Sequence, residues 1–304
     1  MPIDPAAQAI LNALEAAGGP PLDEMEVGEA REAYANLATL TGEGADVAGV
    51  VEREIAGVRS VVVTPHGDGP FPVFVWIHGG GWVIGSATES GSSARDLAAG
   101  ANCVVVSVDY RLAPEHKAPA AVHDTFAVVG WVLDNANEIG GDPRRVAVGG
   151  DSAGGNLAAL AGLEFGDRLC YQVLIYPATD LTLSHPSMEE NAEGYLLTKA
   201  SMVWFTDHYL RDSGIAADDA RVSPLFARDE SLSKAPPAFV ITGELDPLRD
   251  EGEAYAERLR KAGIDVTLRR FDGQIHGFYS MPLAIPAATE AIAQTCELLQ
   301  KAFA

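Results

Sequence analysis

Short apolar runs alternate with longer stretches of mixed polarity along most of this chain. The apolar runs cover residues 58–64, 71–77, 103–108, 146–149, 172–176, 239–242 and 266–271. Mostly apolar runs of this length are typical of strands buried on both faces of a parallel sheet. The stretches between them predict helices near residues 91–100, 120–138, 153–164, 249–262 and 286–302. This alternation predicts an α/β fold with a mostly parallel central sheet and, because crossovers are right-handed, helices on both faces.

Two segments interrupt the alternation. Residues 1–45 have apolar side chains at helical spacing on both sides of the turn Gly18-Gly19-Pro20-Pro21, which predicts two helices. Residues 177–238 separate two strands and are too rich in large apolar side chains for a disordered linker, so we expect much of this segment to be helical. We expect the two segments together to form a helical cap over the sheet.

The order of these segments divides the chain into an N-terminal part of the cap, a first part of the core, a cap insertion and a second part of the core. The expected bounds of the four parts are residues 1–45, 46–180, 181–225 and 226–304. In the first core part, the runs at 58–64 and 71–77 are joined by the turn sequence His66-Gly67-Asp68-Gly69-Pro70. We expect these two runs to pair as a hairpin that opens the sheet.

The acidic balance of the chain limits its partners. It contains 43 Asp and Glu against 21 Lys and Arg, a formal net charge of −22. A polyanion would be repelled, so neither nucleic acid nor an anionic membrane is an expected partner. No apolar run reaches the roughly 18 residues of a transmembrane helix, and acidic side chains stand where a signal peptide would carry positive charge. We therefore expect a cytoplasmic protein.

Cysteine usage agrees with that compartment. The three cysteines, Cys103, Cys170 and Cys296, form no CxxC pair and have no metal-ligand spacing. The sequence therefore predicts a reducing compartment, with neither a disulfide framework nor a metal site.

A strand, a sharp turn and a helix surround the best candidate for a nucleophile. The sequence Gly150-Asp151-Ser152-Ala153-Gly154 follows the run at 146–149 and leads into the helix expected near 153–164. This GxSxG pattern is the nucleophile elbow of α/β-hydrolases, in which small residues let the strand and the helix approach closely around a strained serine. We expect Ser152 to be the nucleophile. The N–H of Ala153, at the start of the helix, is expected to bind the developing oxyanion.

A glycine-rich loop supplies the other expected oxyanion donors. His78-Gly79-Gly80-Gly81-Trp82 directly follows the run at 71–77. Consecutive glycines adopt backbone angles closed to other residues, so their N–H groups can face a substrate oxygen. We expect Gly80 and Gly81 to be the donors and His78 to brace the loop rather than act as the general base. Trp82 is expected to pack in the core first and to line the substrate pocket second.

The general base must follow Ser152 in the chain, because α/β-hydrolases have the order serine, acid, histidine. Three histidines qualify by this order: His185, His208 and His276. His276 lies in a loop after the last strand run, whereas the other two fall in the expected cap. We therefore predict that His276 is the base.

The acid is expected in the loop after the run at 239–242, where an orienting carboxylate is required. Asp246 occupies that loop and is our candidate. The alternatives are Glu244, Asp250 and the more distant Asp272, each of which could equally be a solvated loop charge.

Five segments together resemble the hormone-sensitive lipase family, the bacterial family IV of carboxylesterases. They are His78 to Trp82, Asp109-Tyr110-Arg111-Leu112-Ala113-Pro114-Glu115, Gly150 to Asn156, Asp246-Pro247-Leu248 and His276-Gly277-Phe278. The resemblance covers essentially the whole chain. It implies an α/β-hydrolase fold with a mostly parallel sheet of about eight strands and a two-part helical cap. It also implies an intracellular esterase for short- to medium-chain esters that needs no cofactor and often forms a homodimer.

These residues predict a serine carboxylesterase that cleaves small-molecule esters through an acyl-enzyme on Ser152. An amide hydrolase or deacetylase would use the same triad, so this alternative stays open. A non-catalytic ligand receptor is a more remote alternative, because it would have kept a strained nucleophile without use. The substrate pocket is expected to be lined by Trp82 and by residues of the cap: Tyr195, Leu196, Met202 and Trp204.

Overall fold

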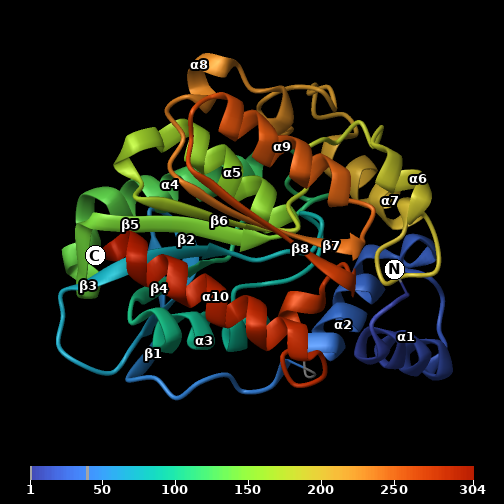
Figure 1. The fold of residues 1–304 in the computed structure, drawn as a ribbon, viewed down its shortest axis with the longest axis horizontal. Coiled ribbons are helices and arrows are strands. Elements are labelled where there is room, and N and C mark those ends of the chain that lie inside the picture. The colour runs from blue at the N-terminus through green and yellow to red at the C-terminus, as the bar shows by residue number, and fades with distance from the viewer. Residues whose placement is uncertain (1, 39–40) are drawn as a thin grey trace.

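A computed structural model, which describes residues 2–38 and 41–304, contains one eight-stranded sheet between two layers of helices (Figure 1). The strands are β1 (Gly49–Ile55), β2 (Val58–Thr64), β3 (Phe71–Ile77), β4 (Val104–Val108), β5 (Gly141–Asp151), β6 (Tyr171–Ile175), β7 (Ala238–Leu245) and β8 (Val266–Ile275). Their order in the sheet is β1-β2-β4-β3-β5-β6-β7-β8. Both pairings of β2 are antiparallel, and the pairings from β4 through β8 are parallel. The mostly parallel α/β-hydrolase sheet expected from the sequence is confirmed.

Helices cover both faces of the sheet. On one face lie α3 (Gly91–Ala101) and α10 (Pro286–Phe303), and on the other α4 (Ala120–Asn135), α5 (Ala153–Phe165) and α9 (Arg249–Lys261) (Figure 1). The strands present valine, isoleucine and phenylalanine to both layers, and separate apolar clusters form on the two sides. Burial on both faces explains why central strands such as β3 and β4 are apolar along most of their length instead of alternating.

The expected hairpin between the runs at 58–64 and 71–77 is wrong. β3 lies inside the sheet between β4 and β5, while β2 pairs with β1 and β4. All seven residues of β3 are buried, as a central parallel strand requires. The real hairpin joins β1 to β2, and its turn residues Ala56 and Gly57 have φ of 51° and 82°. The sequence pattern missed β1, because this edge strand leaves Val50 and Val51 exposed and alternates poorly.

The remaining helices gather where β7 and β8 end (Figure 1). They are α1 (Pro5–Ala17) and α2 (Val27–Ala38) from the N-terminal segment, and α6 (Pro186–Glu190) and α7 (Lys199–Leu210) from the insertion. The short helix α8 (Asp229–Leu232) lies apart from them, close to α9 in the chain. Residues 1, 39 and 40 of the N-terminal segment lie outside the described residues. Helices are thus present in both segments for which the sequence predicts them.

Two partly exposed ion pairs involve the segment from Asp109 to Glu115, and one of them joins α2 to the core. Arg31 of α2 pairs with Glu115 at 2.7 Å and donates to the carbonyls of Val83 and Ala113. Arg111 binds Asp124 of α4 at 2.7 Å. These contacts account for two charged residues of the Asp109 to Glu115 segment as structural groups.

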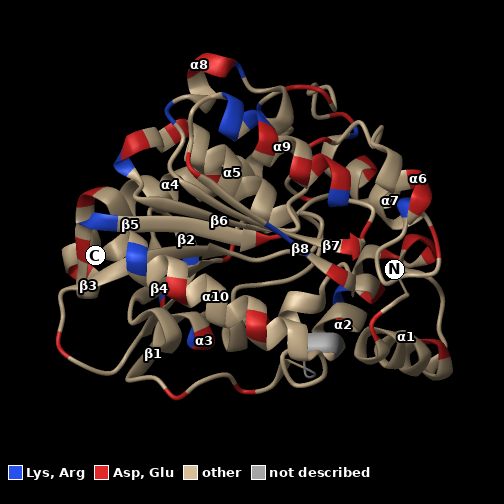
Figure 2. Ribbon diagram, in the orientation of Figure 1, with Lys and Arg blue, Asp and Glu red and all other residues tan. Residues whose placement is uncertain are grey.

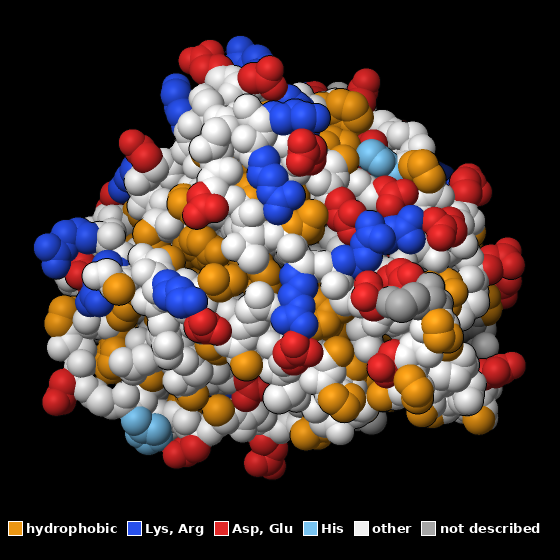
Figure 3. Space-filling view, viewed as in Figure 1, with side chains coloured by type: hydrophobic (Ala, Val, Ile, Leu, Met, Phe, Trp, Pro, Cys, Tyr) orange, Lys and Arg blue, Asp and Glu red, His pale blue; other side chains and the backbone are white. Residues whose placement is uncertain are grey.

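The surface carries mixed charges. Acidic side chains are spread over helices and loops, and Lys and Arg are fewer (Figure 2). On the face shown in Figure 3 the two kinds interleave around small hydrophobic patches, without a continuous basic stripe of the kind that binds a polyanion. Within residues 2–38 and 41–304, no helix combines the length and the apolar character needed to cross a membrane.

Candidate active site

The nucleophile elbow joins the end of β5 to the start of α5. Ser152 has φ of 56° and ψ of −118°, a strained conformation for a residue with a side chain. A Cβ on Gly150 would lie 2.3 Å from the carbonyl oxygen of Ile77, and one on Gly154 would lie 2.0 Å from the same atom. Both glycines are therefore required, because the end of β5 and the start of α5 approach the Ile77 carbonyl of β3 closely.

A chain of hydrogen bonds connects the three residues predicted as nucleophile, base and acid. The Nε2 atom of His276 lies 3.0 Å from Ser152 Oγ, and its Nδ1 lies 2.7 Å from Asp246 Oδ2. Asp246 is fully buried, and its other oxygen accepts from the Leu248 N–H at 2.8 Å. The Tyr176 ring packs 4.5 Å from the imidazole. The carboxylate and the ring are thus held in one arrangement, with the imidazole between acid and hydroxyl.

The other histidines after Ser152 have different partners. His185 Nε2 lies 3.3 Å from Asp180 Oδ2, and His208 Nδ1 lies 2.9 Å from the Trp204 carbonyl oxygen. Neither contacts the nucleophile.

The alternative carboxylates are also engaged elsewhere. Glu244 accepts from the Gly273 N–H at 2.7 Å, and Asp250 accepts from the Ser187 N–H at 2.9 Å. Asp272 is exposed. Of the four carboxylates considered from the sequence, the structure brings Asp246 to the imidazole.

The glycine loop after β3 is shaped for donation to an oxyanion. Gly80 has φ of 114° and Gly81 has φ of 56°, and the Gly80 carbonyl accepts from the N–H groups of Val83 and Ile84. Their own N–H groups have no acceptor among the described residues. A Cβ on Gly81 would lie 2.2 Å from the Phe205 ring, so a larger residue would displace α7 from the loop.

His78 lies beneath this loop. Its Nδ1 is 2.7 Å from the Gly79 carbonyl oxygen, and its ring stacks on Tyr110 at 4.3 Å. Burial lowers the pKa of His78, which favours the neutral ring. These contacts fit the bracing role expected from the sequence.

Asp151 is a site residue to which the sequence analysis assigned no role. Its Oδ1 accepts from the Gly79 N–H at 2.9 Å and so ties the nucleophile elbow to the glycine loop. Burial raises the pKa of Asp151 to about 6. An acidic residue directly before the nucleophile was the available signal, but its partner became visible only in the fold.

A cavity of about 180 Å³ opens at the nucleophile. Ser152, His276 and the glycine loop line it on one side, and α2, the loop before α3 and residues 196–205 supply other walls. The wall residues include Tyr34, Glu89, Leu196, Leu197, Phe205 and Met281. A second cavity, of about 10 Å³, lies on the other side of Gly81, beside Ser152 and Ala153. Ser152 therefore lines one larger and one smaller cavity.

Comparison with known proteins identifies the family. Residues 74–280 match a family model described as alpha/beta hydrolase fold. The carboxylic ester hydrolase LipN of Mycobacterium tuberculosis is 45% identical over 71% of this chain and 60% of its own length. The ethyl acetate hydrolase of Pseudomonas putida is 32% identical over 99% of both proteins. The crystal structure of LAE6, an alpha/beta hydrolase enzyme from the metagenome of Lake Arreo, has a TM-score of 0.94 at 37% identity, covering 99% of this chain and 98% of its own.

The chain belongs to the α/β-hydrolase carboxylesterases. The family and the fold expected from the sequence are confirmed, and the enzyme class is that of carboxylic ester hydrolases.

The residues predicted to line the substrate pocket of this esterase are distributed unevenly. Leu196 lines the large cavity, and Trp82 and Met202 line the small one. Trp82 also stacks on Tyr209 at 4.6 Å in the core, in keeping with its expected packing role. The structure places Tyr195 and Trp204 in the lining of neither cavity.

Some wall residues escaped the sequence analysis. Phe205 and Leu197 directly follow the predicted residues Trp204 and Leu196. Only the direction of each side chain decides whether that residue lines the cavity. Tyr34 lies in α2, far from every motif, and Glu89 follows the glycine loop without belonging to the motif, so no local signal marked either residue. Among the residues the structure describes, no group of three or more His, Cys, Asp or Glu side chains is arranged to hold a metal ion.

Proposed function

We propose that this chain hydrolyses short- to medium-chain carboxylic esters by nucleophilic catalysis, with Ser152 as nucleophile, His276 as base and Asp246 as orienting acid. The observation that carries the proposal is the continuous hydrogen-bond chain from Asp246 Oδ2 through the imidazole to Ser152 Oγ, at 2.7 and 3.0 Å. Each distance lies within the reach needed for proton transfer. The hydroxyl proton passes to Nε2 as Oγ attacks the ester carbonyl.

The oxyanion formed by this attack is bound by the N–H groups of Gly80, Gly81 and Ala153. The positive φ of both glycines and the position of Ala153 at the start of α5 support that assignment. The tetrahedral intermediate collapses when His276 returns the proton to the leaving alcohol, which leaves an acyl-enzyme. His276 then takes a proton from water as this water attacks the acyl carbonyl. When the second tetrahedral intermediate collapses, the imidazolium returns the proton to Ser152 Oγ, which releases the carboxylic acid and regenerates the enzyme.

The cavities support a preference for small substrates. A 180 Å³ cavity holds a short alkyl or aryl group, whereas the 10 Å³ compartment holds about one water-sized group. A relative named for ethyl acetate, matched over 99% of this chain, supports the same substrate class. We propose that the helices of residues 1–45 and 181–225 form the cap that closes this space.

The remaining expectations extend the proposal. We propose a cytoplasmic enzyme, which the three free cysteines support. We also propose that it forms a homodimer, as its family resemblance implies.

The test is hydrolysis of p-nitrophenyl esters from acetate to palmitate by the wild type and Ser152→Ala, without added metal. We expect turnover of the short esters by the wild type and a fall in kcat of at least about 10³-fold in the variant, because the nucleophile is lost. Matched anilides run in parallel separate an esterase from an amide hydrolase. Wild-type inactivity on every ester, or unchanged activity of Ser152→Ala, would contradict the proposal.

A further inference from the structure

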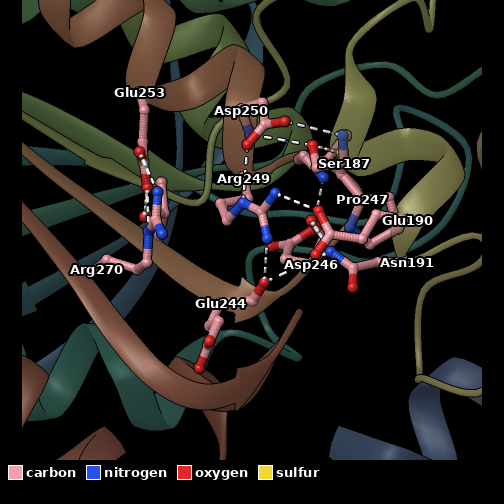
Figure 4. Close-up of polar contacts among 12 residues, drawn as sticks. Ser187, Glu190, Asn191, Glu244, Asp246, Pro247, Arg249, Asp250, Glu253 and Arg270 are labelled. Carbon is pink, nitrogen blue, oxygen red and sulfur yellow. Dashed lines mark hydrogen bonds and ion pairs between the residues drawn. The ribbon is translucent and has the colours of Figure 1, made fainter. Parts of the chain in front are cut away.

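Buried residues of the insertion form hydrogen bonds to the loop that carries Asp246 (Figure 4). The Ser187 hydroxyl of α6 donates to the Pro247 carbonyl at 2.7 Å and accepts from the Asp250 N–H at 3.1 Å. The Ser187 N–H donates to Asp250 Oδ2 at 2.9 Å. Asn191, the residue after α6, donates from Nδ2 to the Asp246 carbonyl at 3.1 Å. Ser187 and Asn191 are almost fully buried, so water cannot replace these bonds.

A second set of contacts holds the sides of the same loop. Arg249 pairs with Glu190 of α6 at 2.7 Å and with Asp250 at 2.8 Å. The same guanidinium donates to the Glu244 carbonyl at 3.0 Å (Figure 4). Residues 244–250 are therefore bound along their length to one short segment of the insertion.

The bonds reach the backbone of the acid itself. Within its own loop, the carboxylate of Asp246 accepts one hydrogen bond, from the Leu248 N–H. This bond fixes the orientation of the carboxylate relative to the loop, but it does not fix the position of the loop relative to His276. That position decides whether Oδ2 meets the imidazole at 2.7 Å. Errors of about 1 Å in such a site cost on the order of 10²-fold in rate.

The same insertion also forms the pocket. Leu196 and Leu197 follow Asn191 within a few residues, and both line the large cavity together with Phe205 of α7. One continuous segment thus touches the substrate space at one end and the acid loop at the other.

We propose that Asn191 and Ser187 are positioning residues for Asp246, and that the insertion is part of the catalytic apparatus as well as a cover for the pocket. This inference rests on the function proposed above. Without the hydrogen bonds from Ser187 and Asn191, the loop that carries Asp246 shifts and the imidazole of His276 loses its orientation, while the pocket still binds the ester. The loss falls on kcat rather than on KM.

The experiment compares Asn191→Ala and Ser187→Ala in two backgrounds, wild type and Asp246→Ala, with p-nitrophenyl butyrate as substrate. Ser184→Ala, an exposed serine in the same segment, is the matched control, and thermal unfolding of every variant is recorded. In the wild-type background we expect kcat to fall about tenfold or more, with KM within about twofold. In the Asp246→Ala background the same substitutions should change kcat less than about twofold, because the group they position is gone.

A residue with a merely structural role would lower kcat by the same factor in both backgrounds, and that result would overturn the proposal. Unchanged kcat in the wild-type background would overturn it as well. Ser187→Ala removes a single hydroxyl, so it provides the test if Asn191→Ala does not fold. Failure of the proposed function itself would appear separately, as activity that survives in Ser152→Ala.

Discussion

Replacing Asp246 by asparagine tests the orientation of the imidazole with almost no change in shape. In the wild type, Oδ1 accepts from the Leu248 N–H at 2.8 Å and Oδ2 faces His276 Nδ1 at 2.7 Å. The asparagine oxygen keeps the Leu248 bond, which turns its amide NH₂ toward Nδ1. Nδ1 must then accept, so the ring proton moves to Nε2, where it faces Ser152 Oγ at 3.0 Å. An imidazole protonated there cannot take the serine proton.

The magnitude follows from the cost of the opposite amide orientation. Turning the amide would restore the active tautomer but place two donors against each other at Leu248. An unsatisfied buried N–H costs about 1–3 kcal/mol, which reduces the active form roughly 5- to 150-fold. Loss of the negative charge beside the imidazolium adds to this, so we expect kcat to fall about 10⁴-fold in total. That is about 5 kcal/mol of transition-state stabilisation.

The assay is p-nitrophenyl butyrate hydrolysis by Asp246→Asn, with KM determined separately from kcat. Asp272→Asn is the control, since Asp272 is exposed and was an alternative acid by sequence. We expect the control to retain wild-type kcat. If Asp246→Asn stayed within about tenfold of the wild type, or Asp272→Asn lost activity instead, the reasoning from this geometry would be refuted.

Two further substitutions probe the elbow. Gly154→Ala places a Cβ 2.0 Å from the Ile77 carbonyl oxygen, so we expect kcat/KM to fall at least about 100-fold and the free energy of unfolding to fall by about 1–3 kcal/mol. Gly130→Ala in α4 is the control: its Cβ would meet Phe165 at 3.5 Å, and urea unfolding should show a gain of about 0.5–1 kcal/mol. The free energy of unfolding of Asp151→Asn minus that of the wild type should increase by up to about 3 kcal/mol as the pH rises from about 4 to 6. The folded pKa of Asp151, about 6, exceeds its ordinary 3.8, so the wild type loses stability in that window. A pH-independent difference in urea unfolding would contradict this.

The local pattern of the chain predicted most elements of the core. β2 and β3 begin and end where their apolar runs do, and α5 and α9 match within a residue or two. The edge strand β1 was missed and β3 was paired with the wrong neighbour. Apolar character reveals burial on both faces, but two buried strands look alike in sequence whether they are neighbours or not.

The candidate site divides in the same way. Ser152 and the glycine loop belong to contiguous motifs, so the sequence determined their chemistry and even the need for glycine at Gly150 and Gly154. The pocket walls could not be predicted in this way, because Tyr34 and Glu89 line the same cavity as Ser152 although both lie far from it in the chain. The sequence also could not show in which direction each side chain of the insertion points. In the structure, Phe205 lines the cavity and Trp204 does not.

By itself, then, the sequence predicted the fold class, the candidate nucleophile Ser152 and the candidate oxyanion loop, since each depends on residues adjacent in the chain. Only the tertiary structure decided the strand order and which of four carboxylates lies beside His276. It also decided the hydrogen bond between Gly79 and Asp151 and the hydrogen bonds from α6 to the loop that carries Asp246. The physical reason is that hydrogen bonds and packing depend on distances of a few ångströms. Between residues remote in the chain, those distances are set by how all the layers pack together.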